Sequence, residues 1–313
     1  MTDMKNYFIR ELGDEVKFNV PLKDFVSLKV GGAAEMFYEA KDIESLTKAI
    51  VAADKKSIPF FVLGGGYNIV PSDAGVAGLV IKNSSSNIIL TPESSVVIAD
   101  SGVSLGRLIN LAAGRDLGGL EFLAGIPSTV GGAIYGNAGS PSSTIGEYVK
   151  SVTMLVKKDD KLVIEKHDKE WMQFGYRTSR LKKNKSKDAF TPVILTATLQ
   201  LIRRRKDEIM QSMKETIHMK KKNQPLDESS AGSFFRNPGI GKEMAAGYLL
   251  EKSGAKKMKI GGATFSRKHA NFLVNKKRAS ADDIRLLAEK AKLAVADKCG
   301  VNLEEEVEYI GQW

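Results

Sequence analysis

The sequence has very few residues of the types that form disulfides and metal sites, with one cysteine, Cys299, and three histidines among 313 residues. A single cysteine cannot form a disulfide within the chain, and the cysteine and histidines do not have the spacing of a metal site. The N-terminal segment also lacks the apolar core of a signal peptide. We therefore expect a cytoplasmic protein that binds no metal.

Charged residues are absent from residues 122–146, a run long enough to cross a bilayer. Six glycines and two prolines interrupt this run, so its backbone could not satisfy its own hydrogen bonds in lipid. We expect no membrane contact here, and instead a glycine-dense backbone packed closely against something large.

The formal net charge of +10 raises the question of an anionic partner, because eight basic and three acidic residues lie within residues 203–222. Nucleic acid is one candidate. However, Ile209, Met213 and Ile217 recur at helical spacing, which favours an amphipathic helix with a solvated basic face. Aromatic residues, 7% of the chain, do not alternate with basic clusters as base-stacking surfaces require. A small polyanionic ligand explains the charge equally well, and we expect no nucleic-acid partner.

Hydrophobic periodicity predicts an α+β protein of two or three domains. Strand patterns occur at residues 60–63, 79–81, 95–99, 152–156 and 192–202, and helical patterns begin near Ile43, after Ser104 and after Ser280. Ser280 and Asp283 form a capping-box pattern, and Gly300 ends that helix. A domain boundary is expected within residues 203–227, and residues 302–313 are expected to form a short strand.

Four separate glycine-rich segments lack charge. They lie at residues 30–33, at residues 64–68 (Gly-Gly-Gly-Tyr-Asn), at residues 125–133 (Gly-Ile-Pro-Ser-Thr-Val-Gly-Gly-Ala) and at residues 137–139. Glycines allow main-chain N–H groups to approach a phosphate closely. One such segment could be a simple turn, but four together indicate a large, flat ligand that carries phosphate.

Three polar segments are candidates for the chemistry. Arg177 follows an aromatic residue and could bind a carboxylate or phosphate through two hydrogen bonds, or could simply be a surface arginine. Ser233 lies between a glycine and two phenylalanines, but it lacks the pattern of a serine nucleophile and has no histidine base, which disfavours acyl transfer. In a strand, Glu304, Glu306 and Glu308 would share one face, although a charged edge strand explains them too.

These segments, taken in order, resemble the UDP-N-acetylenolpyruvoylglucosamine reductase family. The resemblance covers about residues 19–311 and includes Tyr-Arg-Thr-Ser at 176–179, Gly-Ser-Phe-Phe-Arg-Asn-Pro at 232–238, Lys-His-Ala-Asn-Phe at 268–272 and Leu-Glu-Glu-Glu-Val at 303–307. The spacing between Arg177 and Ser233, in the first and second of the polar segments, is similar to that of the shorter branch of the family, which lacks an inserted tyrosine loop.

The resemblance implies an α+β fold with an FAD-binding part of the vanillyl-alcohol-oxidase type in two lobes, plus a C-terminal α+β substrate domain. It implies lobe 1 at residues 1–84, completed by a last strand within residues 301–313, lobe 2 at residues 85–204, and the substrate domain at residues 205–300. The implied activity is the reduction of UDP-N-acetyl-3-O-(1-carboxyvinyl)-glucosamine to UDP-N-acetylmuramate by NADPH through FAD, for peptidoglycan synthesis. We expect a monomer that binds a UDP-sugar.

The resemblance also implies roles for individual residues. The catalytic residues are Arg177 and Glu306, which stabilise charge on the substrate carboxylate, and Ser233, which delivers a proton. The cofactor-binding residues are Gly31, Gly32, Gly64, Gly65, Gly66, Tyr67, Asn68, Gly125, Ile126, Pro127, Ser128, Thr129, Gly131, Gly132, Ala133, Asn137 and Gly139. The substrate-binding residues are Tyr176, Arg236, Asn237 and His269.

The sequence departs from the family pattern at Tyr67, where serine is usual, at Ser128 and Gly136, where glycine and a larger residue are usual, and at Glu308, where arginine is common. The first two departures concern contacts with the FAD diphosphate. Two alternatives remain open. One is another FAD-dependent oxidase of the same fold that acts on an alcohol or sugar, although no histidine or cysteine in the glycine-rich segments could tether a flavin. The other is a basic nucleic-acid-binding protein.

Overall fold

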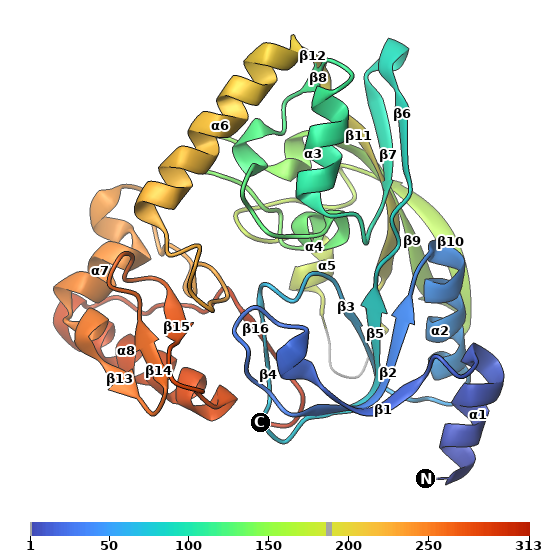
Figure 1. Ribbon diagram of the computed structural model, residues 1–313, viewed down its shortest axis with the longest axis horizontal. Coiled ribbons are helices and arrows are strands. Elements are labelled where there is room, and N and C mark those ends of the chain that lie inside the picture. The colour runs from blue at the N-terminus through green and yellow to red at the C-terminus, as the bar shows by residue number, and fades with distance from the viewer. Residues whose placement is uncertain (1, 186–189) are drawn as a thin grey trace. The chain divides into compact units, whose positions relative to one another are not determined.

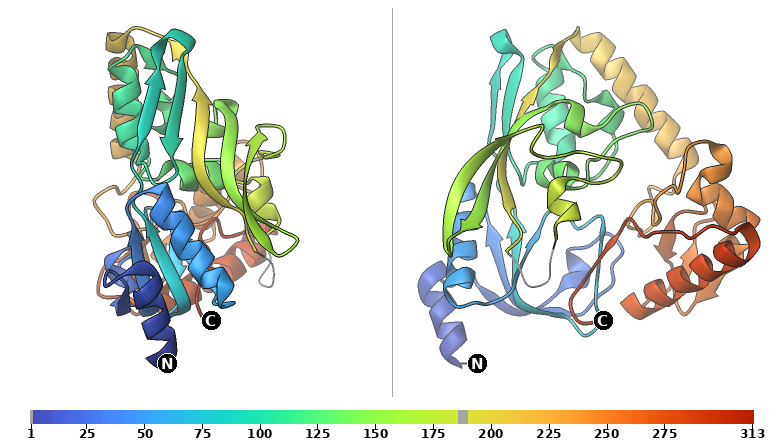
Figure 2. Two further views of the ribbon diagram at one scale, coloured as in Figure 1. Left: turned by 90° about the vertical axis from the view of Figure 1, so that its right-hand side faces the viewer. Right: turned by 180° about the vertical axis from the view of Figure 1, so that it is seen from behind.

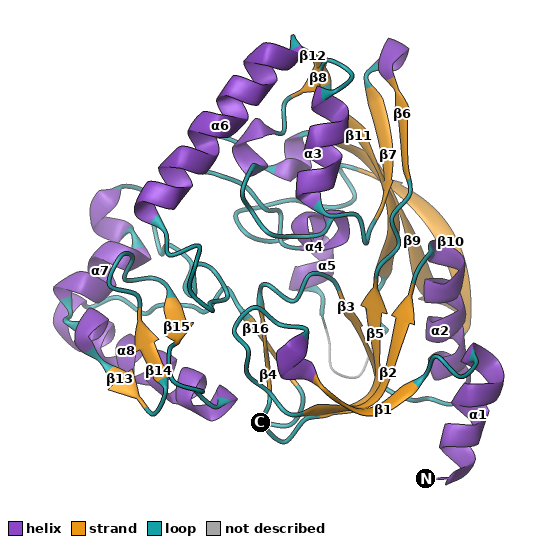
Figure 3. Cartoon of the chain, in the orientation of Figure 1, coloured by secondary structure: helices purple, strands orange, loops and turns teal. Residues whose placement is uncertain are grey.

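The computed structural model describes residues 2–185 and 190–313 (Figure 1). Helices and strands are both abundant (Figure 3), which confirms the predicted α+β class. The helices are α1 (Thr2–Leu12), α2 (Ile43–Lys55), α3 (Leu105–Ala113), α4 (Val130–Tyr135), α5 (Arg180–Lys183), α6 (Lys206–Asn223), α7 (Ala246–Lys252) and α8 (Ala281–Cys299). The strands are β1 (Lys17–Pro21), β2 (Ala33–Ala40), β3 (Phe60–Leu63), β4 (Ile69–Pro71), β5 (Val76–Asn83), β6 (Ile88–Thr91), β7 (Val96–Asp100), β8 (Leu117–Gly118), β9 (Val149–Lys158), β10 (Lys161–Asp168), β11 (Val193–Gln200), β12 (Ile202–Arg203), β13 (Lys259–Ile260), β14 (Ala263–Phe265), β15 (Leu273–Asn275) and β16 (Glu308–Ile310).

The chain divides into two compact units, each built from separate stretches of sequence. The first unit contains Met1–Lys17, Phe37–Gly65 and Leu79–His218, and the second contains Phe18–Met36, Gly66–Gly78 and Met219–Trp313. The change within α6, after His218, falls inside the boundary region that the sequence indicated. The three-part division into two FAD-binding lobes and a substrate domain stays a prediction.

The first unit is built around a five-stranded sheet in the order β10-β9-β11-β7-β6, in which every pair is antiparallel. Residues of α3 and α4 pack on it to form a single apolar core, and Figure 2 shows the twist of the sheet from two further sides. Strands β7 and β11 alternate between buried and more exposed positions over much of their length, as their sequence patterns indicated, whereas most positions of β9 are buried.

A smaller sheet has the order β1-β2-β5-β3. Strands β3 and β5 are parallel, with Leu63 opposite Lys82, so their carboxyl ends meet at one edge of the sheet. Helices α1 and α2 belong to the first unit, where the hydroxyl of Tyr7 donates a hydrogen bond to the carbonyl oxygen of Ala52 at 3.1 Å. The sequence analysis did not identify α1, because Phe8 and Leu12, which it buries, are too few to give a clear period.

The second unit packs α7 and α8 with the three-stranded sheet β13-β14-β15 around its own apolar core. The carboxylate of Asp73 accepts hydrogen bonds from the N–H groups of Ala281 and Asp282, each at 3.0 Å. This carboxylate therefore satisfies two free donors in the first turn of α8. Strand β16 pairs in parallel with β4, so the end of the chain returns to a strand within residues 1–84.

Helix α6 confirms the amphipathic interpretation of the basic segment. Ile209 and Met213 are buried in the core of the first unit, and Ile217 packs against it. The predicted helix caps are also present, since Ser104 accepts a hydrogen bond from the N–H of Arg107 and Gly300 ends α8 with a positive φ of 67°.

Candidate active site

In the first unit, two of the glycine-rich segments are in close contact through Gly64 and Thr129. Gly64 follows the end of β3, and a Cβ atom on it would lie 2.8 Å from the hydroxyl oxygen of Thr129. Thr129 is buried and caps α4, where its side chain accepts a hydrogen bond from the N–H of Gly132. A larger residue than glycine at position 64 would therefore push the two segments apart.

Main-chain hydrogen bonds hold the glycine-rich segment at residues 125–133 against residues 101–105. The N–H of Leu105 donates to the oxygen of Ser128 at 2.9 Å, and the N–H of Gly131 donates to the oxygen of Ser101 at 2.8 Å. The hydroxyl of Ser128 donates to the oxygen of Thr129 at 3.1 Å. The serine that replaces the usual glycine is thus accommodated without disturbing this backbone.

The joined segments present a surface that fits a cofactor carrying phosphate. Gly125 and Gly132 are exposed, Gly64 and Gly65 are half-buried, and none of the side chains carries charge. Within the described parts of the chain, the N–H groups of Gly65, Gly125 and Ser128 donate no hydrogen bond. Free N–H groups beside closely packed glycines are the donors that an anionic group needs.

The fourth glycine-rich segment, residues 137–139, contacts the Arg177 loop rather than the ligand that we expected. Buried Asn137 donates a hydrogen bond from Nδ2 to the oxygen of Gly175 at 2.9 Å, and its Oδ1 accepts one from the N–H of Gly146 at 3.0 Å. Gly139 accepts a hydrogen bond from the guanidinium of Arg177 at 2.7 Å. Both residues therefore position the loop of Arg177, and their assignment as cofactor ligands stays a prediction.

Arg177 lies in a tight turn, with a positive φ of 54°. The N–H and carbonyl groups of Gly175 and Thr178 bond to each other at 3.0 and 3.2 Å across this turn. The guanidinium carbon lies 5.2 Å from the centroid of the Tyr176 ring, in cation–π contact. The turn and the bond to Gly139 restrict where this cation can reach.

In the second unit, the first glycine-rich segment has a packing role. A Cβ on Gly31 would lie 2.7 Å from Cβ of Pro71, and one on Gly32 would lie 2.3 Å from the oxygen of Asp73. The N–H of Gly32 also donates to the oxygen of Ser72 at 2.8 Å. These contacts explain the two glycines without a ligand, and their role as cofactor ligands is untested.

The second unit also brings Ser233 and Glu306 onto neighbouring strand segments. Phe235 and Glu305 form an antiparallel bridge, and the N–H of Glu306 donates to the oxygen of Phe234 at 2.8 Å. Ser233 directly precedes Phe234 and is half-buried. The main chain of Glu306 is held further by Asn68, whose Nδ2 donates to the oxygen of Glu306 at 3.1 Å.

The final strand differs from the prediction, because the regular strand β16 begins at Glu308 rather than near residue 302. Residues around Glu305 pair antiparallel with the Phe235 segment, whereas β16 pairs in parallel with β4. A segment that changes partners does not keep one strand register. The structure therefore gives no single strand on which Glu304, Glu306 and Glu308 would share a face, as we had expected.

Neighbouring glutamates have separate partners. The carboxylate of Glu305 bonds to the ammonium of Lys292 at 3.0 Å, and exposed Glu304 lies 3.8 Å from the guanidinium of Arg236. The Nε atom of Arg236 is buried and has no hydrogen-bond partner among the described residues. Arg236 therefore keeps a donor that a substrate oxygen could use.

Two predicted substrate-binding residues are engaged in holding the fold. Oδ1 of Asn237 accepts a hydrogen bond from the N–H of Ala246 at 2.9 Å, at the first residue of α7. Nδ1 of His269 accepts one from the N–H of Asn271 at 3.1 Å, and its ring packs against Phe272. Burial, with a smaller effect of Lys256, lowers the pKa of His269, so this ring is neutral near pH 7.

Sequence reasoning missed two residues beside the candidate site. Asn271 is buried and bonds to the main chain of Phe235, and Lys82 bonds to the carbonyl oxygen of Gly64. The available signals were a polar residue inside the Lys-His-Ala-Asn-Phe motif and a lysine near the end of an apolar strand. Neither signal identifies a partner by itself.

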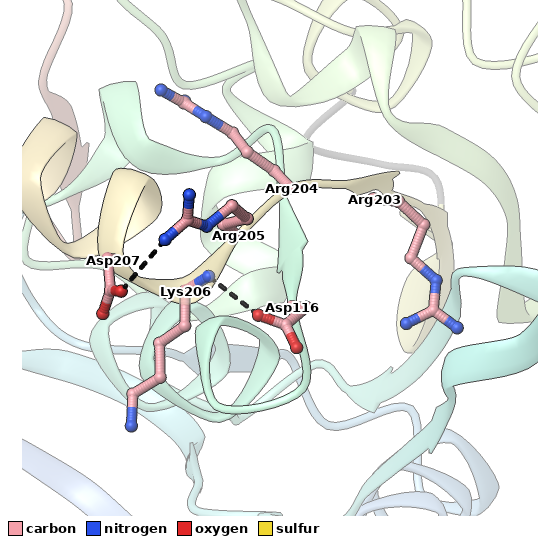
Figure 4. Close-up of a pocket in the computed structure, with 6 residues that line it drawn as sticks. All are labelled: Asp116, Arg203, Arg204, Arg205, Lys206 and Asp207. Atoms are coloured by element: carbon pink, nitrogen blue, oxygen red, sulfur yellow. Dashed lines mark hydrogen bonds and ion pairs between the residues drawn. The ribbon is translucent and has the colours of Figure 1, made fainter.

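A surface pocket of about 570 Å³ is lined by none of the predicted site residues. It is lined by Asp116, Arg203, Arg204, Arg205, Lys206 and Asp207 (Figure 4). Arg204 pairs with Glu121 at 3.2 Å, and Arg205 pairs with Asp207 at 3.7 Å. The side chains of Arg203, Arg204 and Lys206 point in three different directions, so they do not converge on one anion.

Residues 2–185 and 190–313 contain no group of three or more histidine, cysteine, aspartate or glutamate side chains arranged to hold a metal ion. Among the helices in those residues, none is long and apolar enough to cross a membrane.

Comparison with known proteins shows the family. Residues 34–164 match the FAD binding domain family, and residues 224–310 match the UDP-N-acetylenolpyruvoylglucosamine reductase C-terminal domain family. The chain is 36% identical over 297 residues to UDP-N-acetylenolpyruvoylglucosamine reductase of Anoxybacillus flavithermus, covering 95% of both chains. It is 37% identical over 299 residues to the Clostridium novyi reductase, covering 96% of this chain and 93% of the relative.

A solved structure agrees with these matches. The crystal structure of the reductase from Thermus caldophilus has 31% sequence identity and a TM-score of 0.76, covering 95% of this chain and 98% of the other. This likeness and the FAD-binding match confirm the predicted fold class. The chain belongs to the UDP-N-acetylenolpyruvoylglucosamine reductase family.

Proposed function

We propose that this protein reduces the enolpyruvyl group of UDP-N-acetyl-3-O-(1-carboxyvinyl)-glucosamine to give UDP-N-acetylmuramate, with FAD as cofactor and NADPH as reductant. The observation that supports it most directly is the strand pairing that holds Glu306 next to the Ser233 segment, in a chain that belongs to this reductase family. When bound, FAD accepts two electrons from NADPH and passes them to the substrate double bond.

The glycine-rich segments bind the cofactor in this proposal. Gly65, Gly125 and Ser128 offer main-chain N–H groups on an uncharged surface, and the contact between Gly64 and Thr129 keeps the two segments together. Tyr67, which replaces the usual serine, is exposed. We infer that the cofactor is held without a covalent bond.

Arg177 stabilises the substrate carboxylate. Electrons that enter the double bond place additional negative charge on this carboxylate, so a fixed guanidinium stabilises the transition state more than the ground state. The bond to Gly139 and the contact with Tyr176 hold the guanidinium without neutralising it. A cation with little freedom loses little entropy as the charge develops.

Ser233 and Glu306 complete the reaction on the substrate. The hydroxyl of Ser233 donates a proton to the carbon next to the carboxylate, and Glu306 shares the stabilisation of the carboxylate with Arg177. An ordinary hydroxyl is a weak acid, so the transfer depends on a strongly basic enolate and on close placement of the serine. Arg236, with its unused Nε donor, contacts a phosphate of the UDP group.

The cellular location, the oligomeric state and the domain bounds are also part of the proposal. We propose a cytoplasmic monomer. Its first FAD-binding lobe would contain residues 1–84 and 301–313, its second lobe residues 85–204, and its substrate domain residues 205–300. A sedimentation experiment on the purified protein tests the monomer, and a dimer at working concentration would contradict it.

The reaction is tested in two anaerobic steps. The purified protein should be yellow, NADPH should bleach the flavin, and the UDP-linked enolpyruvyl sugar should restore the colour while UDP-N-acetylmuramate forms in equal amount. Oxygen uptake driven by an alcohol or sugar would instead indicate an oxidase of the same fold. Colourless protein that shifts DNA in a salt-dependent way would indicate the nucleic-acid-binding alternative.

A further inference from the structure

Lys82 lies beside the first glycine of the candidate cofactor loop. It is near the carboxyl end of β5, opposite Leu63, the last residue of β3. Its ammonium donates a hydrogen bond to the carbonyl oxygen of Gly64. Ligands bind beyond the carboxyl ends of parallel strands in many open sheets, and Lys82 places a positive charge at this edge.

The charge of Lys82 is incompletely paired in the protein. The side chain is half-buried, and it forms no ion pair with a carboxylate in the described residues. An ammonium has three donors, and Gly64 is the one acceptor that the described structure provides. Holding a cation partly away from water with no carboxylate in direct contact is costly, and a bound anion would reduce that cost.

The surroundings of Lys82 agree with an anionic partner. Burial lowers the pKa of its ammonium, and the charge of Glu39 opposes this shift. Glu39 is on β2 and accepts a hydrogen bond from the hydroxyl of Ser84 at 2.6 Å. A phosphate next to Lys82 would favour the charged ammonium much more strongly than this carboxylate does.

We propose that Lys82 binds a phosphate group of the flavin cofactor, with the carbonyl oxygen of Gly64 fixing the direction of the ammonium. The neighbouring N–H of Gly65 donates no hydrogen bond within the described protein. It belongs to the same trans peptide as the carbonyl oxygen of Gly64 and points in the opposite direction, so the ammonium and this N–H would contact different groups of the cofactor. The proposal rests on the placement of FAD at the glycine-rich segments.

The competing explanation is that Lys82 only tethers the Gly64 loop. Flavins that differ in phosphate content separate the two roles. Full-length protein freed of flavin is titrated with FAD, FMN and riboflavin, and binding is followed by flavin fluorescence. The variants are Lys82→Met, which removes the charge, Lys82→Arg, which keeps it, and Lys48→Met, a matched control at an exposed lysine of α2.

Lys82→Met should weaken the binding of FAD and of FMN by about tenfold or more. It should change the affinity for riboflavin by less than about twofold, because riboflavin has no phosphate. Lys82→Arg should retain most of the FAD affinity, and Lys48→Met should bind all three flavins as the unmodified protein does. Equal losses for FAD and riboflavin would overturn the proposal in favour of a tether. Unchanged FAD affinity would overturn it outright.

Two further measurements keep the result decisive. If circular dichroism shows that Lys82→Met is unfolded, the proposal is tested by the salt dependence of flavin binding to the unmodified protein. Added salt must then weaken the binding of FAD more than the binding of riboflavin. Gly132→Leu tests the placement of the cofactor separately. If Gly132→Leu binds FAD normally, the placement of FAD at the glycine-rich segments is wrong. If Gly132→Leu loses FAD and Lys82→Met binds FAD normally, only the Lys82 proposal is wrong.

Discussion

The side-chain amide of Asn271 holds the main chain of Phe235 by two hydrogen bonds, one in each direction. The N–H of Phe235 donates to Oδ1 at 2.9 Å, and Nδ2 donates to the oxygen of Phe235 at 2.8 Å. A third bond joins the N–H of Phe234 to the main-chain oxygen of Asn271 at 2.8 Å. Asn271 is therefore a positioning residue for the segment that carries Ser233.

Asn271→Asp should slow the step in which substrate reoxidises the flavin by about tenfold or more, while NADPH reduces the flavin at the normal rate. Aspartate still accepts from Phe235 but cannot donate, and its charge repels the carbonyl oxygen. A displacement of about 1 Å at the reacting residues is enough for such a loss. Stopped-flow absorbance resolves the two steps.

The matched control for that variant is Asn275→Asp, because Asn275 also donates from Nδ2 to a main-chain oxygen, that of Leu28, at 3.0 Å. It should lower the melting temperature without a selective effect on reoxidation. Equal slowing of both steps by Asn271→Asp, or the same selective loss in Asn275→Asp, would show that Asn271 is merely structural.

Arg177→Lys should lower turnover by more than about tenfold, equivalent to about 1.4 kcal/mol of transition-state stabilisation. A lysine carries the charge but cannot reproduce a planar contact with two oxygens while also bonding to Gly139. Arg180→Lys is the control, since Arg180, the first residue of α5, packs over Trp171 and has no proposed substrate contact. Normal turnover in Arg177→Lys would mean that only general positive potential is needed.

Ser233→Ala should leave the reduction of flavin by NADPH nearly intact and severely slow product formation, because the hydroxyl acts only on the substrate. Rapid-mixing experiments on each step provide the measurement, with Ser230→Ala, in the same segment, as the control. If Ser233→Ala loses both steps together, the serine shapes the pocket rather than supplying a proton.

Glu306→Gln should cripple reoxidation by substrate, whereas Glu305→Gln should be nearly silent in catalysis. Glutamine is close in shape to glutamate, so FAD should stay bound in both variants. Glu305→Gln loses only the partly exposed ion pair with Lys292, worth at most about 1 kcal/mol of stability. A greater effect of Glu304→Gln or Glu308→Gln on stopped-flow reoxidation would show that the catalytic glutamate has been misassigned.

Gly132→Leu should yield a folded protein with little bound flavin. Gly132 is exposed within α4, and a Cβ there would lie 3.2 Å from the hydroxyl oxygen of Ser128, so a larger side chain would cover the surface proposed for FAD. Flavin absorbance per protein measures the loss, and acid precipitation of unmodified protein should release the flavin. Flavin that stays with the denatured protein would contradict non-covalent binding.

Several local elements could be predicted from the sequence because their causes lie within a few residues. Ser280 accepts from the N–H of Asp283 at 3.0 Å, and Asp283 accepts from the N–H of Ser280 at 3.1 Å, as the capping-box pattern indicates. Gly300 ends α8 because a positive φ there suits glycine. The ordered motifs also gave the family, which the comparisons confirm.

Contacts between distant segments were decided by the tertiary structure alone. Asn137 supports the Arg177 loop from 38 residues away, and Asn271 holds Phe235 from 36 residues away. The residue types alone cannot specify such pairs, because an amide side chain can bond to any main-chain group that the fold brings to it. The final segment of the chain shows the same limit. It pairs first with the Phe235 segment and then with β4, but its residues alternate regularly along the sequence, so the sequence does not indicate this change of partner.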